Sequence, residues 1–338
     1  MRSIERGLIV TAIAAAGFIP AGVMTTAASA HMAPQTAHVA AGCRGAGTIR
    51  VGRDPRGVAV NPVTNTIYVA NVQSGTVSRI SGRAGKVTAT IPAGAGPFGV
   101  AVDRRTRTIY VTNDDQGGSV AVIRARSRRM VADVQVGRLP LFVAVNPKTN
   151  TIYATNQEDA TVSVISGRTN SVTATVGVGF DPEGIAVDPR TNRIYVANLS
   201  GKTVSVISGR TNRVTATIHV GTRPDDVAVN PRTNTIYVAV AGRNKVAVIS
   251  GRTNRVTAAI RVSPSPESVA VNPRTDTIFV TTFPSHRVVV ISGRTKTVTF
   301  TIRAGSGLGE VAVNPETNKA YVTDPLRKRV HVLASCRG

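Results

Sequence analysis

Residues 184–220, GIAVDPRTNRIYVANLSGKTVSVISGRTNRVTATIHV, carry the pattern from which the architecture follows. They contain four short runs rich in Val, Ile, Thr and Tyr, at residues 184–187, 193–198, 203–208 and 213–220. These residue types favour β-strands, and the DPRTN and SGRTN segments between them supply the Pro, Gly and Asn that tight turns need. The pattern therefore predicts four antiparallel strands joined by short turns.

The same pattern recurs seven times along the chain. Its aromatic markers are 42 residues apart, with one spacing of 43 caused by the longer loop DDQGGS: Tyr68, Tyr110, Tyr153, Tyr195, Tyr237, Phe279 and Tyr321. Four strands in a period of this length are typical of a propeller blade, and seven blades close a ring around a central channel. We therefore predict an all-β, seven-bladed β-propeller with four antiparallel strands per blade.

The two ends of the chain are expected to build one blade together. The last repeat has only three strands, and GTIRVG at residues 47–52 aligns with ATIHVG at residues 216–221 as the missing fourth. In that alignment Cys43 and Cys336 fall in one turn, which predicts a disulfide worth about 4 kcal/mol or more on the loop-entropy account. The rival interpretation of AAGC as a lipid-attachment box is disfavoured, because the box lacks its Leu and a dozen residues separate it from the apolar run.

The first thirty residues have the features of a secretory signal peptide: a basic start, an apolar run and AASA at its end. We expect residues 31–45 to be a flexible leader and residues 46–338 to form the propeller. The mature protein is then expected outside the cytoplasm, with cell-wall association as a further expectation. A disulfide would persist in that compartment.

The repeated words YVAN, YVTN and YATN, together with VAVNPRTNTIYV, resemble the YVTN-repeat (YncE-like) family of seven-bladed propellers. The resemblance covers residues 50–337 and implies an extracytoplasmic binding or envelope-associated role without a defined reaction. The last three repeats depart from the motif, because Val240, Thr282 and Asp324 replace its final Asn.

A formal net charge of +23 favours acidic partners. Antiparallel blades place the turns between strands one and two, and between three and four, on one rim. One arginine of this rim recurs in every repeat, as Arg83, Arg126, Arg168, Arg210, Arg252, Arg294 and Arg337, and the other turn adds Arg104, Lys148, Arg190, Arg232 and Arg274. We expect this rim, and Arg168, Arg210, Arg252 and Arg294 in particular, to bind an anionic polymer such as a cell-wall phosphate polymer or a nucleic acid backbone. The alternative is an exposed turn inherited by duplication, whose charge keeps the protein soluble.

The opposite rim is expected to hold twelve of the 18 acidic residues: Asp54, Asp114, Asp115, Glu158, Asp159, Asp181, Glu183, Asp225, Asp226, Glu267, Glu310 and Asp324. Five of them lie just before the innermost strands and predict an acidic crescent at the channel mouth: Glu183, Asp225, Asp226, Glu267 and Glu310. We interpret the crescent as a ligand site for a cation, an amine or a basic protein surface, with solubility as the alternative. The spacing matches no calcium loop, so no metal is assigned.

Enzyme signatures are sparse in this sequence. The five histidines are scattered, and neither a GxSxG elbow nor a phosphate-binding glycine loop followed by a helix occurs. The absence of tryptophan and of a recognition helix disfavours base-specific DNA binding. We therefore expect a secreted, monomeric, non-enzymatic binding or scaffold protein for an anionic polymer or a protein partner, without a cofactor. The alternative is a lactonase-like or lyase-like propeller enzyme with its site at the acidic mouth.

Overall fold

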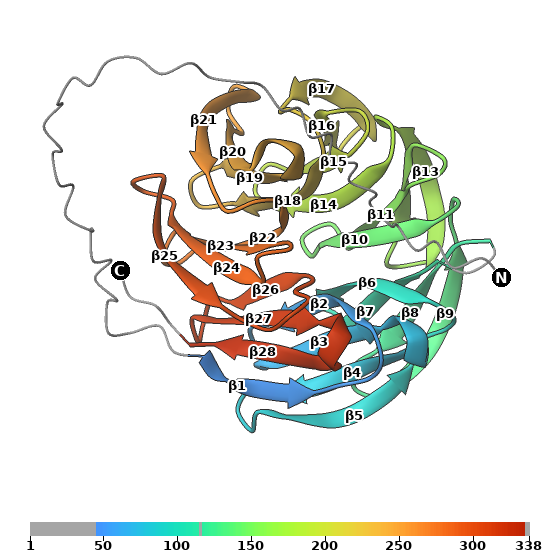
Figure 1. Cartoon of the computed structure of the whole chain (residues 1–338). Coiled ribbons are helices and arrows are strands. Elements are labelled where there is room, and N and C mark those ends of the chain that lie inside the picture. Colours follow the sequence, from blue (N-terminus) through green and yellow to red (C-terminus); the bar gives the residue numbers. More distant parts are fainter. Residues whose placement is uncertain (1–44, 115–116, 335–338) are drawn as a thin grey trace, which may run out of the picture. The chain divides into compact units, whose positions relative to one another are not determined.

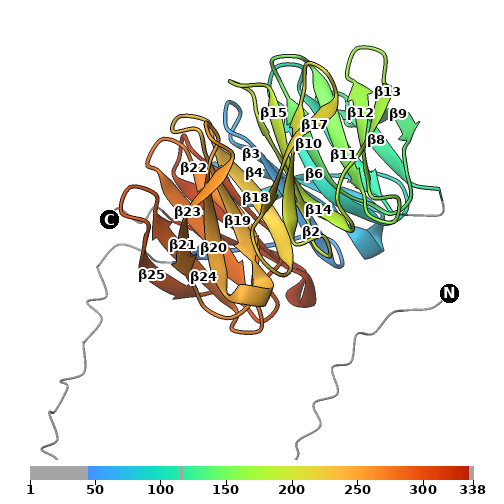
Figure 2. The ribbon, with the colours of Figure 1, turned by 90° about the horizontal axis from the view of Figure 1, so that it is seen from above.

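The predicted seven-bladed β-propeller with four antiparallel strands per blade is confirmed. The computed structural model describes residues 45–114 and 117–334, which form seven four-stranded antiparallel sheets (Figure 1). Each sheet is one blade, and Figure 1 shows the blades following one another around the ring, whereas Figure 2 shows the same strands from above.

The strands are short and recur with nearly constant lengths. Blades 1 to 3 consist of β2 (Pro55–Asn61), β3 (Thr66–Asn71), β4 (Thr76–Ser81) and β5 (Lys86–Pro92); β6 (Pro97–Asp103), β7 (Thr108–Asn113), β8 (Ser119–Arg124) and β9 (Arg129–Gln135); and β10 (Pro140–Asn146), β11 (Thr151–Asn156), β12 (Thr161–Ser166) and β13 (Ser171–Gly177). Blades 4 to 6 consist of β14 (Pro182–Asp188), β15 (Arg193–Asn198), β16 (Thr203–Ser208) and β17 (Arg213–His219); β18 (Pro224–Asn230), β19 (Thr235–Val240), β20 (Lys245–Ser250) and β21 (Arg255–Arg261); and β22 (Pro266–Asn272), β23 (Thr277–Thr282), β24 (Arg287–Ser292) and β25 (Thr297–Arg303). Blade 7 consists of β26 (Val311–Asn314), β27 (Lys319–Asp324), β28 (Arg329–Leu333) and β1 (Gly45–Arg50). Three short 3₁₀ turns accompany them: η1 (Val72–Ser74), η2 (Ala241–Arg243) and η3 (Pro325–Arg327).

The turns form where the sequence supplies residues that tolerate a left-handed backbone. The turn after β14 ends at Asn192 with φ of 55°, and the turn after β16 ends at Asn212 with φ of 52°. Asn adopts this conformation more readily than most residues because its short side chain can bond locally. The Asn at the end of each TN dipeptide therefore sets where the next strand begins.

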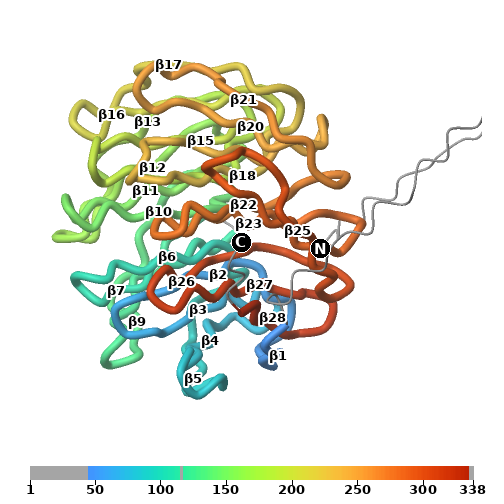
Figure 3. The backbone as a smooth tube through the Cα atoms, turned by 90° about the vertical axis from the view of Figure 1, so that its left-hand side faces the viewer, coloured from blue at the N-terminus to red at the C-terminus, as the bar shows by residue number. Residues whose placement is uncertain are grey.

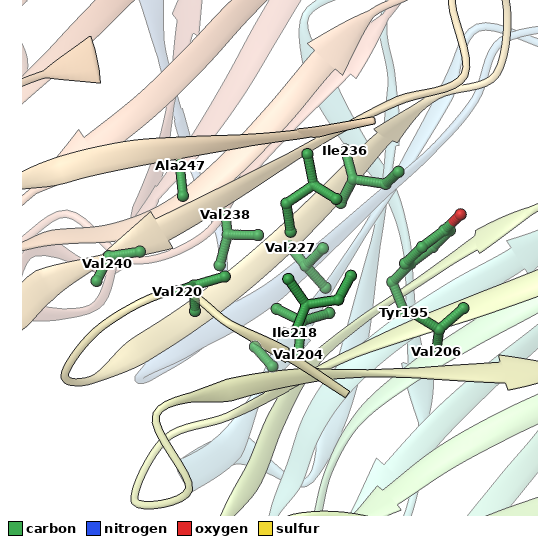
Figure 4. Packing of buried hydrophobic residues seen from close by; sticks show 12 residues of the cluster. Tyr195, Val204, Val206, Ile218, Val220, Val227, Ile236, Val238, Val240 and Ala247 are labelled. Carbon is green, nitrogen blue, oxygen red and sulfur yellow. The ribbon is translucent and has the colours of Figure 1, made fainter. Parts of the chain in front are cut away.

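The hydrophobic core lies between neighbouring blades. In the cluster shared by blades 4 and 5, Tyr195 and Ile218 of blade 4 pack with Val227, Ile236 and Val238 of blade 5 (Figure 4). Tyr195, Ile236 and Val238 are completely buried. Burial of a valine- or isoleucine-sized side chain stabilises the fold by roughly 1.5–3 kcal/mol, so the repeated aliphatic positions hold the blades together.

The Asn that ends the repeated YVAN words has a structural role. Asn198 Nδ2 donates hydrogen bonds of 3.0 Å to Thr203 Oγ1 and to Ser205 Oγ of the neighbouring strand. In blade 7 Asp324 occupies this position; its carboxylate accepts from Arg329 Nε at 3.2 Å and lies 3.0 Å from His331 Nε2. The motif position therefore satisfies buried polar groups within one blade.

Strand β1 closes the ring, as the sequence predicted. It pairs with β28 of the last repeat, so the blue start of the described chain lies beside its red end (Figure 3). The paired strand covers residues 45–50, two residues earlier than the expected 47–52. At the same junction Asn314 Nδ2 donates to Asn65 Oδ1 at 2.8 Å, and Thr323 Oγ1 donates to the Arg56 carbonyl at 2.9 Å.

Several expectations concern residues outside the described part of the chain. Cys43, Cys336 and Arg337 lie there, as do the signal peptide and residues 31–44, so the disulfide and the leader stay predictions. Within residues 45–114 and 117–334, no helix has the length and hydrophobicity needed to span a membrane.

Candidate functional site

Antiparallel pairing divides the loops of the propeller between two rims. The turns after the first and third strands of each blade, such as residues 189–192 and 209–212, lie on what we define as the turn rim. The loops after the second and fourth strands, such as residues 199–202 and 220–223, lie on the opposite mouth rim. The predicted cationic turns and the predicted acidic loops therefore belong to different rims.

The recurrent arginines of the turn rim all reach solvent in the part of the chain that the structure describes. Their side chains are exposed in six successive blades: Arg83, Arg126, Arg168, Arg210, Arg252 and Arg294. Among the described residues of this rim, an ion pair joins Arg274 Nη1 to Glu316 Oε2 at 2.5 Å. The recurrent guanidiniums are thus available to an external anion.

Buried carboxylates of the turn rim bind the protein's own backbone. Asp188 Oδ1 accepts from the Arg190 amide at 2.8 Å, and its Oδ2 accepts from Thr191 Oγ1 at 2.9 Å. Asp103 Oδ1 accepts from the Arg105 amide at 2.7 Å in the same way. Both carboxylates therefore bind donors of their own turns.

A small cavity lies at the centre of the ring, where the first strands of all seven blades meet. It has a volume of about 150 Å³, and its walls come from β2, β6, β10, β14, β18, β22 and the start of β26: Val58, Gly99, Val100, Phe142, Val143, Ile185, Asp226, Ser268, Glu310 and Val311. Gly99 is required here, because a Cβ atom would lie 2.4 Å from the Leu141 carbonyl oxygen of the next blade. The close approach of the strands therefore keeps the cavity small.

Asp226 is held by three hydrogen bonds, two of which cross the boundary between blades 5 and 6. Its Oδ2 accepts from Ser268 Oγ and from the Val269 amide, both at 2.9 Å, and its Oδ1 accepts from the Val227 amide at 2.7 Å. Burial raises the pKa of Asp226 to about 6, and these hydrogen bonds oppose the shift. The carboxylate is therefore fixed in position, and it loses its proton at a higher pH than an ordinary Asp does.

Glu310 has one bound and one unpaired oxygen. Its Oε2 accepts from the Val58 amide at 3.1 Å, while Oε1 is buried without a hydrogen-bond partner. Burial, with the nearby Asp226 carboxylate as a smaller cause, raises the pKa of Glu310 to about 8. At neutral pH this side chain is mostly the neutral acid.

The remaining members of the predicted crescent interact electrostatically with one another. Burial raises the pKa of Asp225 to about 8, and the neighbouring Glu183, Glu267 and Asp226 carboxylates contribute. Burial also raises the pKa of Glu267. Glu183 accepts from Gln157 Nε2 at 3.1 Å. The structure therefore brings the five predicted carboxyl groups together, and burial raises the pKa of four of them: Asp225, Asp226, Glu267 and Glu310.

The position of these residues differs in one respect from the sequence interpretation. Glu183, Asp225, Asp226 and Glu267 lie inside the first strands β14, β18 and β22, and Glu310 alone precedes its strand. In blades 1 to 6 the first strand starts earlier than expected because its Pro already pairs with the second strand, as Pro182 does with Asn198. Four of the five carboxyl groups consequently sit on hydrogen-bonded strands.

The opposite side of the mouth is apolar, which the sequence analysis did not single out. Phe98 and Leu141 occupy the repeat position that holds Glu183, Asp225 and Glu267 in later blades. Phe142 occupies the next position, which holds Asp226 and Glu310. The rings of Phe98 and Phe142 meet edge to face, with centroids 5.7 Å apart and an interplanar angle of 81°. The aligned repeats could have revealed this apolar side, because blades 2 and 3 have apolar residues at the positions where later blades have acidic ones.

The described residues offer no group of three His, Cys, Asp or Glu side chains arranged to hold a metal ion. The mouth combines a small cavity, an apolar wall and carboxyl groups of raised pKa, which is a common composition for small-ligand sites. The turn rim instead offers a broad, exposed cationic surface.

Comparison with known proteins supports the fold. No protein-family model matches the chain, and no curated protein is significantly similar to it. Among solved structures, a chain of Kuenenia stuttgartiensis hydrazine synthase resembles it with a TM-score of 0.76 at 17% sequence identity, over 84% of this chain and 96% of that chain. A likeness at this identity extends to the propeller architecture alone.

Proposed function

We propose that the chain is a secreted, non-enzymatic binding propeller that holds an anionic polymer with a phosphate-rich backbone against its turn rim. The observation that carries this proposal is the exposure of one recurrent guanidinium on each of six successive blades. Arginine is suited to this role because its planar donors match phosphate oxygens. A ring of such groups binds a repeating anion without reading a sequence.

The distribution of the other charges supports the same orientation. Asp103 and Asp188 bind backbone and hydroxyl donors inside their own turns, whereas the five carboxyl groups of the crescent lie at the other end of the channel. Cations outnumber carboxylates on the turn rim, so this rim as a whole attracts a polyanion. We expect binding to weaken steeply with added salt, because counterions are released from the polymer.

The experiment compares two variants that each lose four positive charges. Arg168, Arg210, Arg252 and Arg294 are changed to Ala together on the turn rim, and Arg53, Arg243, Arg261 and Arg303 are changed to Ala together near the mouth rim. Binding of long-chain polyphosphate is measured at low salt by fluorescence anisotropy. We expect a loss of tenfold or more for the turn-rim variant only. An equal loss in both variants would show that only the net charge matters. That result would favour the alternative, in which the arginines belong to exposed turns inherited by duplication and form no binding site.

A second candidate function, an enzyme of lactonase or lyase type at the mouth, is favoured by one observation. Glu310 lines the central cavity, and Asp225 directly precedes Asp226, which also lines it. Both Asp225 and Glu310 have raised pKa values, and carboxyl groups of this kind serve as general acids. Its test is turnover of a lactone panel by the wild type and by Asp225→Asn. Turnover that is lost in the variant, with the fold retained, would favour the enzyme.

We also propose that the chain is a member of the YVTN-repeat family and is exported. The YVAN, YVTN and YATN words and the signal-like first thirty residues support these two points. Recovery of a shortened chain beginning near residue 31 from culture medium or cell-wall extract, identified by N-terminal sequencing, tests export. A full-length chain retained in the cytoplasm would contradict it.

A further inference from the structure

The same small notch recurs between neighbouring blades on the turn rim. It has volumes of about 180, 160 and 150 Å³ between blades 7 and 1, blades 1 and 2, and blades 5 and 6. In each case the buried Tyr of one blade forms the floor and a turn of the next blade forms a wall: Tyr321, Tyr68 and Tyr237. A notch that departs from the common pattern can therefore be compared with the equivalent notches between other blades.

The notch between blades 1 and 2 has an arginine where every other blade has a valine. Arg79 pairs in register with Tyr68, and its equivalents are Val122, Val164, Val206, Val248, Val290 and Val332. Those valines are all buried, whereas Arg79 is partly exposed and lines the cavity. Arg79 Nη1 donates to Thr88 Oγ1 at 2.7 Å, which fixes one edge of the guanidinium.

A second departure lies on the facing wall, in blade 2. Arg107 has φ of 56° and occupies the turn position that holds Asn65, Asn150, Asn192, Asn234, Asp276 and Asn318 elsewhere. A second substitution in the same blade accompanies Arg107. Ala125 stands where five other blades have a glycine, at Gly82, Gly167, Gly209, Gly251 and Gly293. In blade 5 a Cβ atom at that glycine, Gly251, would lie 2.0 Å from Asn234 Oδ1. Removing the Asn side chain makes room for Ala125, so the two changes are sterically consistent.

The exchange also removes a hydrogen-bond acceptor between the blades. Asn230 Nδ2 donates to Asp276 Oδ1 at 2.7 Å, and Asn272 Nδ2 donates to Asn318 Oδ1 at 2.7 Å. The equivalent partner of Asn61 is Arg107, whose side chain has no acceptor. Asn61 lines the notch, so its amide adds a neutral donor to the cavity.

The resulting cavity is rich in donors and contains no carboxylate. Its described lining consists of Asn61, Thr64, Thr66, Tyr68, Arg79, Arg107, Ala125 and Arg126. Three arginines therefore share about 160 Å³, whereas the notch between blades 5 and 6 holds Asp276 and Lys296. One water needs only about 10–15 Å³ of such volume, so a polyatomic group fits with its hydration.

We propose that the notch between blades 1 and 2 binds a tetrahedral oxyanion, a phosphate or sulfate group, between Arg79, Arg107 and Arg126. Guanidinium forks and hydroxyl donors match the oxygens of such a group, and several cations without a carboxylate favour a dianion. The inference rests on the proposed function and deepens it, because it gives the point on the turn rim where one group of the polymer is held.

The test uses two small probes, inorganic pyrophosphate and inorganic sulfate, titrated into the wild type by calorimetry at low salt. We expect at least one of the two probes to bind with one equivalent per protein. The probe that binds more tightly shows whether the notch prefers a phosphate or a sulfate group. The double variant Arg79→Val, Arg107→Gly removes both guanidiniums; Gly tolerates the φ of 56° at position 107 and avoids the clash that an Asn side chain would make with Ala125. It should weaken binding tenfold or more, since a hydrogen bond to a charged group commonly gives this factor. The control Arg261→Ala, Arg303→Ala loses the same charge elsewhere and should change affinity less than threefold. No binding of either probe by the wild type, or equal losses in both variants, would overturn the inference.

The outcome is distinguishable from failure of the proposed function. If polyphosphate binding depends on the four turn-rim arginines but neither small probe binds, the notch is rejected and the rim proposal stands. If a probe binds at the notch but polyphosphate binding is unaffected by the turn-rim variant, the rim proposal fails. Unfolding by urea shows whether the double variant keeps the wild-type fold, and the single variant Arg79→Val serves if it does not.

Discussion

The Glu310 carboxylate accepts a hydrogen bond of 3.1 Å from the Val58 amide, which joins the last blade to the first at the centre of the ring. Its other oxygen is buried without a partner. A neutral acid suits this environment better than a carboxylate, because an unpaired buried charge is costly. The ring is therefore closed at its centre by a group that prefers to keep its proton.

Stability should consequently fall as the pH rises. Burial raises the pKa of Glu310 to about 8, so the folded protein binds this proton more tightly than the unfolded chain does. The stabilisation is present below the pKa of the unfolded chain and is lost as pH rises through the folded pKa. Glu310→Gln should match the wild type near about pH 4 and be more stable near about pH 9, in urea unfolding. The matched control is Asp133→Asn, an exposed side chain on β9; identical pH profiles for Glu310→Gln and wild type would contradict the account.

The hydrogen bond from Asn314 to Asn65 should contribute to ring closure. Asn314 Oδ1 also accepts from the Glu316 amide at 3.0 Å, and Asn61 Oδ1 accepts from the Val63 amide at 3.1 Å in the equivalent turn. The variants Asn314→Ala and Asn61→Ala thus lose the same turn contact, but only the former loses the inter-blade bond. We expect Asn314→Ala to be less stable than Asn61→Ala by about 1 kcal/mol in urea unfolding. Equal losses would show that this bond contributes nothing to closure.

The predicted disulfide between Cys43 and Cys336 lies outside the described residues. A bridge between the two ends would close a loop of nearly the whole chain, and its reduction should lower the free energy of unfolding by about 4 kcal/mol on the loop-entropy account. Peptide mapping under non-reducing conditions identifies the linked peptides. Two free thiols, or a lipid on Cys43, would show that β1 is held by strand pairing without a bridge.

The fold could be predicted almost completely from the sequence, whereas the site could be predicted only in part. Repetition made each strand visible seven times, so the alignment of residues 47–52 with residues 216–221 predicted the closure by β1. The five carboxyl groups were found because they share repeat positions. The raised pKa values of four of them were not predicted, because desolvation depends on how closely the first strands approach one another, as at Gly99.

The departures from the repeat were harder to interpret. Arg79 and Arg107 are visible as exceptions in the sequence, but they belong to different blades and are 28 residues apart. Only the packing of blade 1 against blade 2 places both in the lining of one cavity. The apolar side of the mouth, with Phe98 against Phe142, likewise depends on contacts between blades.

The salt dependence of polyphosphate binding tests the central claim most directly. The logarithm of the association constant is measured against the logarithm of salt concentration for the wild type and for the variant with Ala at positions 168, 210, 252 and 294. If the turn rim holds the phosphate backbone, the slope should become shallower by about one unit for each arginine that contacts a phosphate. A variant with the wild-type slope and affinity would contradict the account.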